Sequence, residues 1–204
     1  MGNKRMLRLF AQLVSIVLHP MLMPLYMLML IFHTQSLFAL TPVTTKWYCY
    51  LVTVLSLILM PLLSIPILRF FHLIRHFALE DKQDRIWVLL IMILTTFLGF
   101  WLVRRIAYTD IVQRLFLIII ILQSILSIIT LRWKISLHLT GIGGMCGMVL
   151  ILGLKYFGQV QGELMFLFLL AGVLASSCLY LNRHTPSQVY IGFLFGFGMV
   201  IFLL

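Results

Sequence analysis

Long apolar runs, separated by short polar stretches, occupy most of the 204 residues of the chain. A run of about 20 apolar residues is long enough to cross the roughly 30 Å hydrocarbon core of a bilayer as one α-helix. The chain is 63% hydrophobic and 10% charged, with a mean hydropathy of +1.14, and soluble domains of this length do not have such a composition. We therefore expect an all-α, polytopic membrane helix bundle that forms a single integral membrane domain over residues 1–204.

The apolar pattern predicts six or seven transmembrane helices. The first run, about residues 9–32, contains His19, Pro20 and Pro24, which predict a kink or a re-entrant hairpin. Further spans are expected at about 47–68, 86–103, 111–131, 136–154, 163–181 and 187–204. The shape of the first run decides between six and seven spans, and the sequence leaves it open. In the span 111–131, hydrogen bonds to a neighbouring helix are expected from Gln123, Ser124 and Ser127.

The net charge of +10 comes from cations in short loops between the apolar runs. Such cations fit membrane topology and anionic lipid better than nucleic acid, which would need a solvated basic patch. We therefore expect membrane lipids and no nucleic acid as partners, and the sequence leaves the oligomeric state open. The positive-inside rule places the face with more cations in the cytoplasm, but a re-entrant first run would turn the polar motifs outward, so the face that carries them stays open.

Two polar stretches lie at the ends of predicted spans. The first runs from Trp133 to His138, and the second, from Ser177 to Gly192, contains Arg183 and His184. Each histidine has a cation nearby, Lys134 or Arg183. An even number of spans separates the two stretches, so the chain returns to the same membrane surface. A lone histidine at a membrane surface can be without a function, but two histidines with cations on one surface indicate a site for an anion.

Two further features of this surface concern phosphate binding. Residues 69–85 are the most charged stretch of the chain, and they form either a solvated amphipathic helix or a source of cations for a phosphate group. Ser136 is predicted to be the N-cap of the span 136–154. The free backbone N–H groups and the positive end of that helix would then face whatever lies beside His138.

The two polar stretches resemble motifs of the type 2 phosphatidic acid phosphatase (lipid phosphate phosphatase) superfamily. Ser136-Leu137-His138 is similar to the core of the family motif Pro-Ser-Gly-His. Ser177 to Gly192 is similar to the motif Ser-Arg-x5-His-x3-Asp, which Val-x-x-Gly follows, with His184 at the histidine. The segment 81–85 looks like a weak version of the first motif, Lys-x6-Arg-Pro. The resemblance covers about residues 69–204 and implies the lipid phosphatase fold with one extra N-terminal span.

The resemblance implies a mechanism without metal or cofactor. His184 would attack phosphorus and become a phosphohistidine. His138 would give a proton to the leaving oxygen and then activate water. Gln188, at the position of the family aspartate, would orient His184. The substrate phosphate would be held by Ser136, Lys134, Arg183, Arg85 and Lys82.

Four positions depart from the family motifs. Ile135 and Leu137 replace the proline and glycine of one motif, and Cys178 and Gln188 replace the arginine and aspartate of the other. In a serine protease triad, exchanging the carboxylate for an amide costs about 10⁴ in rate. Two hypotheses therefore remain: a phosphatase of lipid phosphates or diphosphates in a bacterial inner membrane, or a catalytically retired relative that binds lipid phosphates or acts as a scaffold or carrier. The sequence does not identify the lipid.

Overall fold

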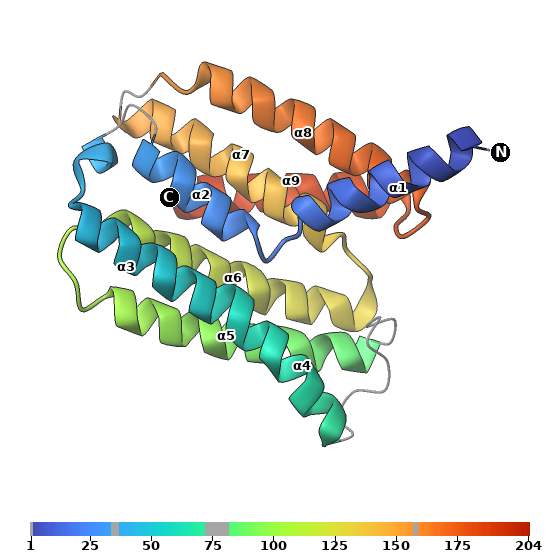
Figure 1. The fold of residues 1–204 in the computed structure, drawn as a ribbon, viewed down its shortest axis with the longest axis horizontal. Helices are drawn as coiled ribbons and strands as arrows, with labels where there is room; N and C mark the ends of the chain where they lie inside the picture. Colours follow the sequence, from blue (N-terminus) through green and yellow to red (C-terminus); the bar gives the residue numbers. More distant parts are fainter. Residues whose placement is uncertain (1, 34–36, 72–81, 157–158) are drawn as a thin grey trace. The chain divides into compact units, whose positions relative to one another are not determined.

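The computed structural model describes residues 2–33, 37–71, 82–156 and 159–204, and they are helical without any strand (Figure 1). This confirms the all-α prediction. Six helices in this part of the chain are long and apolar enough to cross a membrane. They are the continuous helix Val43–Phe70, Ile86–Val103 within α5 (Lys82–Val103), α6 (Asp110–Arg132), α7 (Leu137–Tyr156), α8 (Gln161–Tyr180) and α9 (Pro186–Leu203).

The first apolar run is broken, as its prolines predicted. It forms α1 (Gly2–Val17) and α2 (Met23–His33), and neither is long enough to cross a bilayer alone. Proline lacks a backbone N–H, so Pro20 cannot continue the hydrogen bonding of α1. The His19 carbonyl accepts the N–H of Leu22 at 2.8 Å instead, which makes a tight turn between the two helices.

The contacts divide the chain into two compact units, residues 1–40 with 135–204 and residues 41–134. That the chain forms a single membrane domain over 1–204 stays a prediction. In the second unit α5 packs along α6, and a π-helical stretch, Val54–Leu59, joins α3 (Val43–Thr53) to α4 (Met60–Phe70).

Hydrogen bonds to a neighbouring helix were predicted for Gln123, Ser124 and Ser127 of α6, and one of these three residues makes such a bond. The Thr96 hydroxyl of α5 donates to Gln123 Oε1 at 3.0 Å. Ser124 and Ser127 instead donate to the carbonyls of Ile120 and Gln123 in their own helix. A serine side chain is short, and it reaches the carbonyl four residues earlier more easily than another helix.

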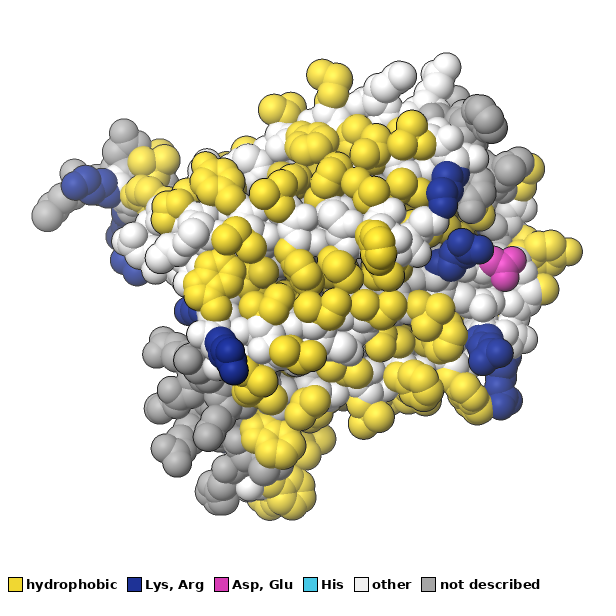
Figure 2. Space-filling view, turned by 180° about the vertical axis from the view of Figure 1, so that it is seen from behind, with side chains coloured by type: hydrophobic (Ala, Val, Ile, Leu, Met, Phe, Trp, Pro, Cys, Tyr) yellow, Lys and Arg dark blue, Asp and Glu magenta, His cyan; other side chains and the backbone are white. Residues whose placement is uncertain are grey.

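In the first unit α7 is the central helix. It packs against α2, α8 and most extensively α9, while α1 packs against α8. Figure 1 shows α2 running along α7, with its last turn toward the end where α7 finishes. Large apolar side chains are exposed in many parts of both units (Figure 2). Exposed apolar surface of this extent is typical of a protein that contacts a membrane or other proteins.

Candidate functional site

The turn after α8 presents Arg183 and His184. The Asn182 N–H donates to Leu179 O at 3.0 Å and the Arg183 N–H donates to Cys178 O at 3.3 Å, which is the bonding pattern of a Schellman motif. This motif needs a left-handed residue just after the helix, and Asn182 has φ 53°. Asparagine adopts this conformation more readily than most residues. The sequence thus ends α8 sharply and turns the next two side chains out of the helix.

His184 is bonded to the amide of Gln188. The backbone N–H of Thr185 donates to Gln188 Oε1 at 3.2 Å, so the amide oxygen must lie at this position. The same oxygen is 3.1 Å from His184 Nδ1. Because an amide oxygen only accepts hydrogen bonds, Nδ1 carries the proton and the lone pair of the neutral ring lies on Nε2. This is the tautomer that a histidine attacking through Nε2 requires.

Glycines bring α7 and α9 into backbone contact, and this contact joins the two motifs. A Cβ built on Gly196 would overlap the carbonyl oxygen of Thr140, and one on Gly192 would lie 2.8 Å from the carbonyl oxygen of Ser136. The Ser136 N–H donates to Gln188 O at 3.3 Å. The start of α7 is therefore bonded to the first turn of α9, and Gln188 in that turn also contacts His184.

Ser15 of α1 connects His138 to Arg183. His138 Nε2 lies 3.1 Å from Ser15 O and 3.2 Å from Ser15 Oγ. Arg183 donates from Nη1 to Ser15 Oγ at 3.1 Å, and Ser15 is only 2% exposed. His138 is also close enough to His184 and Arg183 for electrostatic interaction with both. The structure therefore brings His138, Arg183 and His184 to one end of the first unit.

Ser15 can hold the His138 ring in either proton state. Its carbonyl oxygen accepts a hydrogen bond from Nε2–H, and this bond persists whether or not Nδ1 carries a second proton. An acid/base residue changes its proton state during a reaction and must keep its position while it does so. The contact with Ser15 meets that requirement.

His19 lies beside His138 at the break between α1 and α2, outside the six membrane-length helices. The two rings meet edge to face, with their centroids 5.4 Å apart and an interplanar angle of 83°. Burial lowers the pKa of His19 below its usual value, so its ring is neutral at pH 7.

Ser15 and His19 belong to the candidate site but were not predicted from the sequence. The motif-bearing part was expected at about 69–204, which excludes α1 and α2. The sequence signal is the helical spacing of Ala11, Ser15 and Leu18, which the structure shows to be buried. A polar residue in such a row faces another helix, but the pattern of one helix does not show which partner it faces.

The prediction that Ser136 is the N-cap of α7 is confirmed for its position but not for its hydroxyl. It directly precedes α7, at the N-cap position, but its hydroxyl is buried and has no hydrogen-bond partner among the described residues. Its N–H is bonded to Gln188 O and so does not point toward a ligand. The expectation of a capping hydroxyl was wrong, because close packing against Gly192 of α9 encloses this residue.

The structure does not place the other predicted phosphate ligands relative to His138 and His184, so their role stays a prediction. Lys134 is exposed and belongs to the second unit. Lys82 and Arg85 begin α5, and their side chains lie outside what the structure describes. Cys178, at the position of the family arginine, is 1% exposed. Arg183 is thus the predicted cation that the structure brings to the histidines.

Comparison with known proteins gives no match among family models, curated proteins or solved structures. The resemblance of the two motifs to lipid phosphatases therefore stays a hypothesis. What the chain itself supplies is a membrane-type helical fold and, at one end of its first unit, two histidines and an arginine held by defined hydrogen bonds.

Proposed function

We propose that the protein is a membrane-embedded phosphatase that hydrolyses a phosphate monoester or diphosphate of a lipid at the bilayer surface, in the inner membrane of a bacterium. The observation that carries this proposal is the Gln188 oxygen, which accepts the Thr185 N–H and the His184 Nδ1–H together. It leaves the lone pair of His184 on Nε2, as nucleophilic attack requires. The nearby His138 and Arg183 add an acid/base group and a cation.

The reaction takes two steps. His184 Nε2 attacks phosphorus, the P–N bond forms, and the bond from phosphorus to the lipid oxygen breaks. The His138 imidazolium gives its Nδ1 proton to the leaving oxygen, since Nε2 is held at Ser15. Water then attacks the phosphohistidine and passes a proton to His138, and the P–N bond breaks to release inorganic phosphate.

Arg183 supplies charge stabilisation in both steps. A guanidinium has five N–H donors, and the bond to Ser15 Oγ uses one of them. The remaining donors can bind the phosphoryl oxygens, on which negative charge is concentrated in the transition state. Fixed donors of this kind are usually the largest source of rate enhancement.

The direct test is phosphate release by the purified protein in neutral detergent. Phosphatidate, phosphatidylglycerophosphate, a polyprenyl diphosphate and a lipid A phosphate form the substrate panel. We expect inorganic phosphate from at least one of them. Rapid quenching with a ³²P-labelled substrate should give a protein-bound label that is labile in acid and stable in alkali, as phosphohistidine is. No phosphate and no label with any substrate would contradict the proposal.

A second candidate function is lipid phosphate binding without turnover. Two observations favour it. Cys178 is buried where the family has a phosphate-binding arginine, and Gln188 has a structural role because it caps α9 through Thr185. On this view His138, His184 and Arg183 bind a phosphate group, and no carboxylate is needed to activate the histidine.

Replacing Gln188 with glutamate separates the two candidates. Glutamate has the same length, so its carboxylate can accept from both His184 Nδ1 and the Thr185 N–H. It also stabilises the positive charge that develops on His184. We expect kcat to rise at least about tenfold, which is part of the roughly 10⁴ that a triad carboxylate contributes. Negative charge in the first turn of α9 favours the helix, so the protein should fold.

The measurement is kcat at saturating lipid, with Gln188→Leu as the control that should lower it. Gln188→Leu has no oxygen for His184 Nδ1, and it leaves the Thr185 N–H without its acceptor. Unchanged lipid binding with no turnover in the parent, Gln188→Glu and Gln188→Leu would favour the second candidate.

A further inference from the structure

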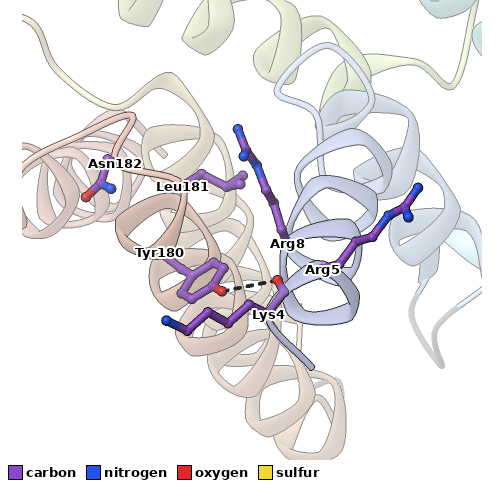
Figure 3. Close-up of a pocket in the computed structure, with 6 residues that line it drawn as sticks. All are labelled: Lys4, Arg5, Arg8, Tyr180, Leu181 and Asn182. Atoms are coloured by element: carbon purple, nitrogen blue, oxygen red, sulfur yellow. Dashed lines mark hydrogen bonds between the residues drawn. The ribbon is translucent and has the colours of Figure 1, made fainter. Parts of the chain in front are cut away.

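A cationic cavity lies between the first turns of α1 and the end of α8 (Figure 3). Its volume is about 480 Å³, within the range of roughly 300–1,000 Å³ that small-molecule sites have. The residues that line it are Lys4, Arg5, Arg8, Tyr180, Leu181 and Asn182. Three of these six are cations and none is acidic, so the cavity is suited to an anion.

Lys4 and Arg8 form the charged wall of this cavity. They are one helical turn apart on α1, and both are exposed. Figure 3 shows the Lys4 side chain beside the ring of Tyr180 and the Arg8 side chain beside Leu181, while Arg5 extends from the other side of α1. The Tyr180 hydroxyl reaches the Lys4 carbonyl oxygen at 3.5 Å, which links α1 to α8 at this point.

The first unit has no carboxylate that could neutralise these cations. In residues 1–40 and 135–204 the sequence contains a single acidic residue, Glu163. Glu163 lies in the first turn of α8 and Tyr180 is its last residue. At 1.5 Å per residue, the two are separated by about 25 Å along the helix. No acidic side chain of this unit is therefore near enough to pair with Lys4 and Arg8, and the cavity keeps its positive charge for an anion from outside the unit.

The exposed side chains of α1 have the composition of a membrane-surface helix. Its exposed large apolar residues are Met6, Leu7, Leu9, Phe10, Leu13, Ile16 and Val17. A helix that combines such a face with lysine and arginine lies with its apolar side chains among the acyl chains and its cations at the lipid headgroups. Phosphate groups of anionic lipids lie at this depth, and basic side chains attract them.

We propose that the α1–α8 cavity binds the phosphate headgroup of an anionic membrane lipid. Lys4 and Arg8 bind the phosphate oxygens, and the acyl chains lie along the exposed apolar side chains of α1. Neither His138 nor His184 lines this cavity, and the inference does not depend on the proposed phosphatase activity.

The test is binding of short-chain phosphatidylglycerol to the purified full-length protein in neutral detergent, followed by titration calorimetry. This lipid is anionic, and as a phosphodiester it is not a substrate of the kind proposed above. We expect Lys4→Gln with Arg8→Gln to weaken binding at least about tenfold, the effect expected for two basic side chains at an anionic headgroup. The matched control is Arg104→Gln with Arg114→Gln, which removes two exposed cations elsewhere and should change binding less than threefold.

Three further measurements make the result specific. The variant with Lys4→Arg and Arg8→Lys conserves the charges and should bind like the parent. Such a result would show that the double glutamine variant binds more weakly because it lacks charge and not because it is misfolded. The same tenfold loss should appear in a His184→Ala background, which separates this cavity from the candidate catalytic site. Short-chain phosphatidylcholine, which is zwitterionic, should bind more weakly than phosphatidylglycerol.

The proposal is overturned if the Lys4 and Arg8 double variant binds phosphatidylglycerol as the parent does. It is also overturned if the control pair causes an equal loss, because the effect would then come from net charge. Inorganic phosphate that binds as tightly as the lipid would identify a free-phosphate site and exclude the lipid as occupant.

Discussion

His184→Ala should abolish phosphate release. The substitution removes the nitrogen that forms the bond to phosphorus, and loss of a nucleophile lowers kcat by at least about 10⁴-fold in serine proteases. The protein-bound ³²P label should disappear with the activity. Lipid binding should persist, because Arg183 keeps its bond to Ser15 without the imidazole. Phosphate release and binding of a non-hydrolysable lipid phosphonate, measured on the same preparation, test both expectations.

The matched control for this variant is His33→Ala. His33 ends α2 and is exposed, so its removal should leave kcat unchanged. Thermal unfolding of both variants in detergent shows whether they fold like the parent. A His184→Ala protein that folds, binds the phosphonate and still releases phosphate at the parent rate would exclude His184 as the nucleophile.

Gly196→Ala should destabilise the protein strongly and inactivate it. A methyl group at this position would overlap the Thr140 carbonyl, with its carbon 2.8 Å and Gly144 N 3.0 Å away. All three are backbone atoms, so relief requires α7 and α9 to move apart. Overpacking of this kind typically costs about 1–3 kcal/mol, which corresponds to an unfolding midpoint lowered by about 2–12 °C in a protein of this size. Thermal unfolding in detergent measures the shift.

Gly198→Ala is the matched control for this substitution. It lies on the same helix two residues later, and a methyl group there would meet nothing within 4 Å. Alanine is the better helix former, so this variant should be at least as stable as the parent. Equal midpoints for Gly196→Ala and Gly198→Ala would contradict the close α7–α9 packing on which the site depends.

Most of the helical architecture could be predicted from the sequence, because lipid allows few alternatives. The span expected at about 111–131 is α6, Asp110–Arg132, and the span expected at about 163–181 is α8, Gln161–Tyr180. A backbone in hydrocarbon has to satisfy its hydrogen bonds internally, so an apolar run of this length becomes a helix. The division into two units was not visible, because it depends on contacts between helices distant in sequence.

The parts of the candidate site that could be predicted are those whose residues are close together in the sequence. His184 and Gln188 are four residues apart, and the resemblance to the lipid phosphatase motif implied that Gln188 orients His184; the structure places Gln188 Oε1 3.1 Å from His184 Nδ1. Ser15 could not be found in this way, because it meets His138 from 123 residues away. The prediction that the Ser136 hydroxyl caps α7 was wrong for a related reason. Gly192, which packs against Ser136, belongs to another helix. The residues around Ser136 in the sequence do not show which helix packs against it.

The contact between Ser15 and His138 also has a consequence for biogenesis. The ribosome completes α1 and α2 long before it makes α7, and the whole second unit is synthesised in between. At about 5–20 residues per second, the 123 residues between the two side chains take roughly 6–25 s to synthesise. During this interval the N-terminal helices have none of their partners from 135–204. A nascent chain released before α7 therefore inserts helices into the membrane but cannot assemble the site.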